Sequence, residues 1–182
     1  MSTFEMSHEK EALLKNNIID ISDKEITGDT AWYVRCCLTY LCTVGCPDIE
    51  IRITCKGGDA RVSFAIYDQL RRYSGMTTGV VEGFAYSGAA TLLQGCKKRI
   101  SYEHSFLWIH GPVLPEVPLH VMENKKLREE RMVTAKRDRK TLYTILAKRT
   151  KRTVKEIDAQ CRLDKIMTAQ EALKFGLIDE IV

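Results

Sequence analysis

The chain has 182 residues, which is typical of a single domain (residues 1–182) and long enough to bury a hydrophobic core without disulfide or metal cross-links. Hydrophobic residues make up 45% of the chain and charged residues 29%, which excludes a disordered chain, and no apolar run reaches the length of a membrane-spanning helix. The net charge of +4 is too small to require a nucleic-acid partner by itself.

In the first half of the chain, hydrophobic periodicity and turn residues predict alternating helices and strands. Residues 1–15 show no strong pattern and form either an arm or a first helix. The predicted elements are a strand over 17–22, a helix over 31–42, a strand over 48–54 with three isoleucines on one face, a helix over 60–73, a strand over 77–82 that ends at Gly83, and a helix over 87–94.

The second half begins with two short predicted strands, over 99–102 and 105–109, followed by an extended loop that contains Pro112, Pro115 and Pro118. Residues 120–149 contain no Gly or Pro and predict one long helix. Two further helices are predicted, over 154–161 and from Ala169; the last begins at a capping box and ends at Gly176. Strands separated by helices predict an α/β fold built from βαβ units.

The long predicted helix carries most of the basic charge. Residues 125–155 hold 13 Lys or Arg and 3 Asp or Glu, so they have a net charge of +10 and the other residues a net charge of −6. A basic segment on an acidic body fits either a nucleic-acid interface or a contact between subunits. Interleaved aromatic residues are missing from the segment, which argues against nucleic acid.

The seven cysteines are an odd number, which argues against a disulfide framework, and the polar N-terminal residues show no secretory signal. We therefore expect reduced thiols and a cytoplasmic location. Four cysteines lie close together in the sequence, but their spacing does not form paired Cys-x2-Cys zinc ligands and no histidine accompanies them. We expect all seven to be structural, with those of the helix over 31–42 buried.

The segment Gly83-Phe-Ala-Tyr-Ser87-Gly-Ala-Ala90 places a serine where a strand meets a helix. A sharp turn of this kind needs small neighbours, and it exposes the hydroxyl above the helix N-terminus, where amide groups stabilise negative charge. The same pattern suits a serine that only caps the helix. From the residues alone, Ser87 is either a nucleophile or a capping residue.

A serine nucleophile requires a base. His110 follows an apolar strand at a point where loops open, whereas His8 and His120 lie in segments expected to be solvated. His104, before the same strand, is the competing candidate. The pair Gly57-Gly58 follows another strand and either brings the backbone close to a ligand or forms an ordinary turn.

Taken in order, these segments resemble the proteolytic subunit of the Clp protease family. The resemblance rests on the Gly57-Gly58 turn with its following helix, the nucleophile turn around Ser87, the Trp108-Ile-His110 segment and the closing pattern over 162–179, and it covers roughly residues 13–182. It implies a divergent member with the ClpP/crotonase-like α/β fold, an N-terminal arm over 1–15 and a protruding handle helix within residues 113–149.

The resemblance implies a serine endopeptidase of a self-compartmentalised protease, in which Ser87 is the nucleophile, His110 the general base and Asp164 the residue that orients the imidazole. Backbone N–H groups of Gly58 and Gly88 would form the oxyanion hole. The residues alone do not distinguish Asp164 from Asp158 or Asp179. No metal and no organic cofactor is implied.

The implied partners are peptide or unfolded-protein substrates and further copies of the chain in a homo-oligomeric ring, with two rings stacked. An ATP-dependent unfoldase is the family's usual partner, but the short N-terminal segment argues against a conventional one. No membrane partner is expected, and the basic handle favours subunit contacts over nucleic acid. Three alternatives remain: a catalytically silent ClpP-like structural or regulatory subunit, a crotonase-like acyl-CoA enzyme and a nucleic-acid-binding module.

Overall fold

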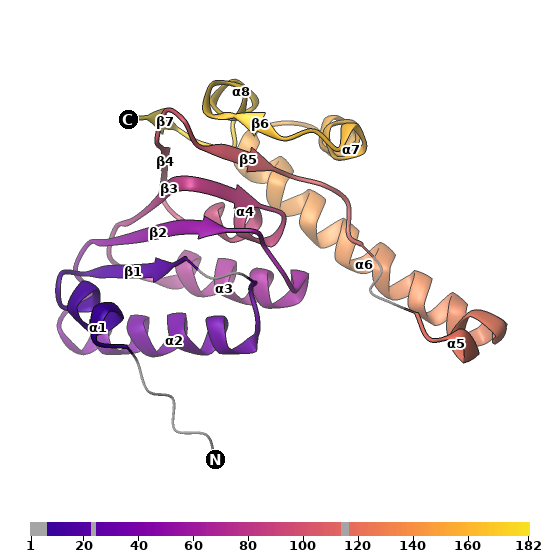
Figure 1. Cartoon of the computed structure of the whole chain (residues 1–182), viewed down its shortest axis with the longest axis horizontal. Helices are drawn as coiled ribbons and strands as arrows, with labels where there is room; N and C mark the ends of the chain where they lie inside the picture. Colours follow the sequence, from indigo (N-terminus) through magenta and orange to yellow (C-terminus); the bar gives the residue numbers. More distant parts are fainter. Residues whose placement is uncertain (1–6, 23–24, 114–116) are drawn as a thin grey trace, which may run out of the picture.

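The computed structural model of the chain describes residues 7–22, 25–113 and 117–182. Within these ranges the chain forms a mixed α/β structure around a seven-stranded sheet (Figure 1). The strands are β1 (Ile18–Ile21), β2 (Ile49–Cys55), β3 (Thr77–Tyr86), β4 (Lys98–Ser101), β5 (Phe106–Trp108), β6 (Met167–Thr168) and β7 (Glu180–Ile181). The predicted α/β fold class is confirmed.

The sheet has the order β1-β2-β3-β4-β7, with β5 also paired to β3 and β6 paired to β5. All pairings are parallel except that of β5 with β6. Ile49, Ile51 and Ile53 of β2 are buried and alternate with half-buried residues, as their period of two predicts. Because β2 and β3 are parallel neighbours, their carboxyl ends lie side by side, which brings the Gly57-Gly58 turn next to Ser87.

Strand β3 is longer than predicted. It continues past Gly83 to Tyr86, because its first part pairs with β4 and residues Phe84 to Tyr86 pair with β5. A glycine inside a strand gives no local signal that the strand continues. The strand continues here because β5 provides backbone hydrogen bonds to the part of β3 that extends beyond β4. Strands β6 and β7 were not predicted, since two residues are too few for a periodic pattern.

Helices cover the two ends of the sheet. Figure 1 shows α1 to α3 along β1 and β2, and α7 and α8 beside β5 and β6. The bounds are α1 (His8–Lys15), α2 (Gly28–Thr43), α3 (Ala60–Arg72), α4 (Gly88–Leu93), α5 (Leu119–Glu123), α6 (Lys125–Thr150), α7 (Val154–Leu163) and α8 (Ala169–Phe175). The capping box predicted at Thr168 and the helix end predicted at Gly176, which has a φ of 94°, are both present.

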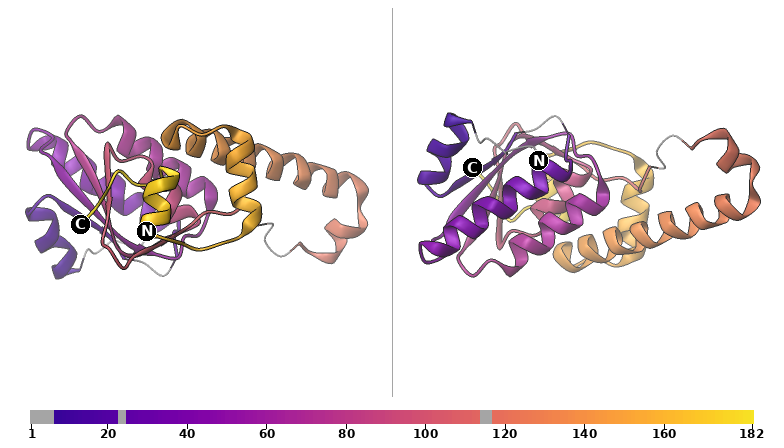
Figure 2. Two further views of the ribbon diagram at one scale, coloured as in Figure 1. Left: turned by 90° about the horizontal axis from the view of Figure 1, so that it is seen from above. Right: turned by 90° about the horizontal axis from the view of Figure 1, so that it is seen from below.

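The basic segment forms two helices instead of the single predicted one. Asn124 separates them with an extended backbone, and its side-chain oxygen accepts a hydrogen bond from Leu127 N at 3.2 Å, which starts α6. In both views of Figure 2 the pair projects from the body. The buried residues of α6 all lie in its last turns, where the helix contacts the body. The predicted proline loop lies partly outside the described residues, which omit 114–116.

Candidate active site

Ser87 lies at the junction of β3 and α4 with a strained backbone. Its φ of 53° and ψ of −118° are values that L-residues rarely adopt and that cost about 1–3 kcal/mol. The conformation is held from both sides, since Ser87 N donates to the carbonyl of Trp108 at 2.7 Å and the Ser87 carbonyl accepts from Thr91 N at 3.2 Å. Its side chain makes no capping hydrogen bond to α4, so the structure does not support the capping role.

The turn at Gly57 packs directly against this junction. A β-carbon built on Gly57 would lie 2.6 Å from the carbonyl oxygen of Tyr86 and 2.8 Å from both Gly88 N and Ser87 Cβ. Only a residue without a side chain permits this approach, and the φ of 95° at Gly57 also favours glycine. The glycine pair is therefore a site of close backbone contact with the turn that carries Ser87.

Two backbone amides lie beside Ser87. Gly58 is held by its neighbours, because Ile26 N donates to the Gly57 carbonyl at 2.7 Å and Asp59 N donates to the Ile26 carbonyl at 3.0 Å. A β-carbon on Gly88 would lie 3.5 Å from Gly58 N, so the two glycines are neighbours. Among the residues that the structure describes, neither Gly58 N nor Gly88 N has a hydrogen-bond acceptor.

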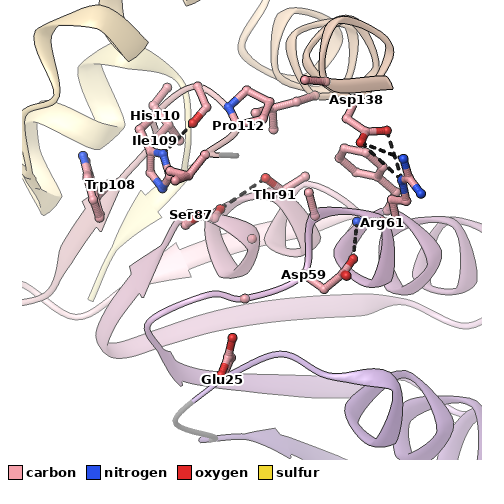
Figure 3. A pocket seen from close by; sticks show the side chains of 18 of the residues that line it. Glu25, Asp59, Arg61, Ser87, Thr91, Trp108, Ile109, His110, Pro112 and Asp138 are labelled. Carbon is pink, nitrogen blue, oxygen red and sulfur yellow. Dashed lines mark hydrogen bonds and ion pairs between the residues drawn. The ribbon is translucent and has the colours of Figure 1, made fainter. Parts of the chain in front are cut away.

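His110 follows β5 and lies on the same side of the cavity as Ser87 (Figure 3). Its ring packs on Trp108 with a centroid separation of 4.4 Å, and its Nδ1 is 2.7 Å from the carbonyl oxygen of Gly111. A proton on Nδ1 is donated to that oxygen, which leaves the lone pair on Nε2 to accept a proton. In the described part of the chain, no hydrogen bond joins His110 to Ser87.

The cavity has a volume of about 620 Å³ and is lined by residues of α3, α4, β5 and α6 and of the loops beside them. Ser87, Gly58, Gly88 and His110 all contribute to its lining. Figure 3 shows the ion pair of Arg61 with Asp138 at the opposite end, where the two side chains are 3.2 Å apart and join α3 to α6. Sequence reasoning did not identify this pair, because nothing local links residues 77 positions apart.

Asp164 is not among the residues that line the cavity. It is exposed, ends α7 with a left-handed φ of 50°, and makes no hydrogen bond with His110. Its strand context is informative, since β5 and β6 are antiparallel with Phe106 opposite Thr168 and Leu107 opposite Met167. Asp164 precedes Met167 by three residues, and His110 follows Leu107 by three residues, so the pairing brings the two segments close in the fold.

The competing residues are engaged elsewhere. Asp158 accepts a hydrogen bond from Arg162 at 2.7 Å, and Asp179 accepts one from Arg99 at 3.0 Å. His104 is 94% exposed and does not line the cavity. Among the described residues that line the cavity with Ser87, His110 is the only histidine.

The expectation of buried cysteines in α2 was partly wrong. Cys37 is buried, whereas Cys36 is half-buried and Cys42 is exposed. Within the described ranges, no group of three or more His, Cys, Asp or Glu side chains is placed to hold a metal ion. The same part of the chain contains no helix that is both long and apolar enough to cross a membrane.

A strained serine on a strand-to-helix turn, with two backbone amides beside it, is the geometry of a nucleophile elbow. The chain belongs to the Clp protease family, because the family model described as Clp protease matches residues 3–182. Its mixed α/β structure with a seven-stranded sheet is consistent with the fold of that family.

Individual relatives agree with this assignment. The chain is 35% identical over 137 residues to an ATP-dependent Clp protease proteolytic subunit 1 from Thermobifida fusca, a match that covers 74% of this chain and 60% of the relative. It is 32% identical over 167 residues to an ATP-dependent Clp protease proteolytic subunit from Bacteroides fragilis, covering 87% of this chain and 75% of the relative. The chain thus spans less than two thirds of the first relative and three quarters of the second.

Proposed function

We propose that the chain is the serine endopeptidase subunit of a Clp-type protease. The observation that carries this proposal is the backbone of Ser87, which is strained and well anchored while its hydroxyl makes no capping bond. Strain of this kind persists where a function requires it. The family membership of the chain and the names of its relatives support the same activity.

In the proposed reaction, the Ser87 hydroxyl attacks the carbonyl carbon of a peptide bond while Nε2 of His110 accepts its proton. The resulting oxyanion accepts hydrogen bonds from Gly58 N and Gly88 N, and the loss of one such donor costs about 10² to 10³ in rate. His110 then donates the proton to the leaving amine. Water, activated by the same histidine, hydrolyses the acyl-enzyme and restores Ser87.

Asp164 is proposed to orient His110. In the structure the Gly111 carbonyl faces Nδ1, and a proton on Nδ1 would leave Nε2 free to accept the Ser87 proton in the proposed reaction. We propose that the Asp164 carboxylate replaces this carbonyl in the active form and stabilises the imidazolium. The pairing of β5 with β6 supports the assignment, because it sets Met167, three residues after Asp164, opposite Leu107, three residues before His110.

The proposal includes assembly into rings, with two rings stacked through their handles. Several apolar side chains of the handle region are exposed, and contact with further copies would bury them. They are Val113, Leu119, Met122, Met132 and Val133. The relatives' names describe ATP-dependent proteases, so an ATP-driven partner belongs to the proposal. That partner would hydrolyse the ATP, since this chain has no Gly-Lys-Ser/Thr phosphate loop.

The test is labelling by a fluorophosphonate probe together with cleavage of short fluorogenic peptides. Wild type and the control Ser74→Ala, which removes an exposed hydroxyl elsewhere, should be labelled and active, whereas Ser87→Ala should show neither. Activity that survives in Ser87→Ala would contradict the assignment. A wild type that assembles into rings but is neither labelled nor active would support a silent structural subunit instead.

A matched pair of variants tests the third residue. Asp164→Asn should reduce peptidase activity by up to about 10⁴-fold, because the imidazolium loses its carboxylate. Asp158→Asn, which disrupts a surface pair with Arg162 on the same helix, should leave activity unchanged. Equal activity of the two variants would show that Asp164 does not act on His110.

A further inference from the structure

The end of helix α2 brings two cysteine thiols together. Gly45 and Cys46 both have left-handed backbones, with φ of 97° and 53°, and Cys46 N donates to the carbonyl of Leu41 at 2.9 Å. The chain therefore folds back over the last turn of the helix. The sulfur of Cys46 lies 2.8 Å from the sulfur of Cys42. A left-handed conformation is unusual for cysteine and is commonly occupied by Gly or Asn at a helix end.

These two thiols have access to solvent, as does the half-buried Cys36, but they also lie against each other. Cys42 is exposed and Cys46 is half-buried, whereas Cys37, Cys55, Cys96 and Cys161 are buried. Burial raises the pKa of the Cys37 and Cys161 thiols to about 11 and that of Cys96 to about 12, which keeps these three protonated. Accessibility and proximity to a second thiol thus coincide at Cys42 and Cys46.

We propose that Cys42 and Cys46 form a dithiol that low-molecular-weight disulfides, such as oxidised glutathione, convert into an intrachain disulfide. One cysteine thiolate attacks the oxidant, forms a mixed disulfide and releases one glutathione thiolate. The second cysteine thiolate then attacks the sulfur of the first and releases the second glutathione. Two protein thiols lose two protons and two electrons, and the oxidant is reduced to two thiols.

The dithiol is separate from the candidate active site. Cys46 precedes the amino end of β2, whereas Gly58 and Ser87 follow the carboxyl ends of β2 and β3. The turn is also anchored, because the Tyr73 hydroxyl donates a hydrogen bond of 2.7 Å to the Pro47 carbonyl. The disulfide should therefore form without displacing Ser87, and the inference does not depend on the proposed peptidase activity.

Differential alkylation of the native full chain tests the proposal. After incubation with oxidised glutathione and blocking of remaining thiols, mass spectrometry of the tryptic peptide 36–52 should show the loss of two hydrogens and a Cys42–Cys46 link. The contact with Cys46 holds the pKa of Cys42 above its ordinary value, so the rate should rise with pH. Reduction with dithiothreitol should restore both thiols.

Single variants separate pairing from mere exposure. Cys42→Ser and Cys46→Ser should each stop at a mixed disulfide that retains one glutathione, whereas Cys36→Ser should form the disulfide as wild type does. Two separate glutathione adducts on the wild type, unchanged thiols, or a link that involves Cys36 would each overturn the proposal. Circular dichroism of every variant establishes that the native fold is retained.

Discussion

Ser87, the proposed nucleophile, has an unfavourable backbone conformation. Because glycine adopts a positive φ without a steric penalty, Ser87→Gly should be more stable than Ser87→Ala by about 1 kcal/mol, although both lack the hydroxyl. Urea denaturation of the two variants measures this difference. At Ser101, a buried residue of β4, the order should be reversed, because glycine is unfavourable inside a strand. An alanine preference at both sites would contradict a strained turn.

Gly58 is predicted to be intolerant of a side chain. Its φ of 150° disfavours other residues, and an added β-carbon would overlap the backbone oxygen of Ile26 and lie 2.5 Å from its nitrogen. Gly58→Ala should therefore destabilise the chain by about 2 kcal/mol and displace the proposed oxyanion donor, with the proposed peptidase activity falling about 100-fold. Thermal unfolding and peptide cleavage measure the two effects.

Gly83→Ala is the matched control for that variant. A β-carbon at Gly83 meets the nearest atom, Thr54 Cγ2, at 3.4 Å, which is close to ordinary contact. Its stability should remain within about 0.5 kcal/mol of wild type. If the stability of Gly58→Ala were also within about 0.5 kcal/mol of wild type, the prediction that close packing on Ile26 excludes a side chain at Gly58 would be wrong.

At the scale of elements, α6 divides into an anchored end and a projecting end. Leu146 is fully buried near the C-terminal end, whereas Met132 in the projecting part is 44% exposed. Leu146→Ala should lower the free energy of unfolding by about 3 kcal/mol, because it leaves a cavity in the core. Met132→Ala should change the stability of the isolated subunit by less than about 0.5 kcal/mol.

Chemical denaturation of the dissociated subunit measures both effects, and sedimentation of the assembled protein separates folding from association. A weaker assembly with unchanged subunit stability in Met132→Ala would support the proposed handle contacts. A large loss of subunit stability in that variant would instead show that the handle packs against the body.

At the scale of the whole molecule, Arg99 joins the last strand to the rest of the sheet. Its side chain is 5% exposed, and it donates to the Asp179 carboxylate at 3.0 Å and to the Gly176 carbonyl at 3.0 Å. Burial alone would raise the pKa of Asp179, but the hydrogen bonds and charge of Arg99 lower that pKa below its ordinary value. The ion pair therefore ties the end of the chain to β4.

Asp179→Asn should destabilise the chain by about 2 kcal/mol at pH 7, since Arg99 loses its counter-charge and the partial exposure of Asp179 reduces the effect. The pKa of Asp179 is lower in the folded state than in the unfolded state, where it is about 3.9. The pair therefore contributes fully to the free energy of unfolding above the unfolded pKa, and this contribution is lost as pH falls through the folded pKa. Urea denaturation at pH 7 and near pH 3 should show the difference between wild type and variant shrinking in acid. A difference independent of pH would contradict the ion pair.

Much of the fold was predictable because its signals are local. The alternation in β2, the capping box at Thr168 and the glycine at 176 each depend on residues adjacent in sequence, and all are present. The continuation of β3 beyond Gly83 and the strands β6 and β7 depend on partners far along the chain, so they were missed. Asn124, which divides the handle, acts through a single capping bond that periodicity does not detect.

The same division holds for the candidate site. By itself, the sequence determined that a serine with small neighbours stands between a strand and a helix, because sterics at a sharp turn restrict which residues fit there. The tertiary structure alone decided that Gly57 packs against this turn, that His110 and Ser87 line one cavity, and that Arg61 pairs with Asp138 at the far end of that cavity. The physical reason is that parallel strand pairing and helix packing set these contacts between segments distant in sequence.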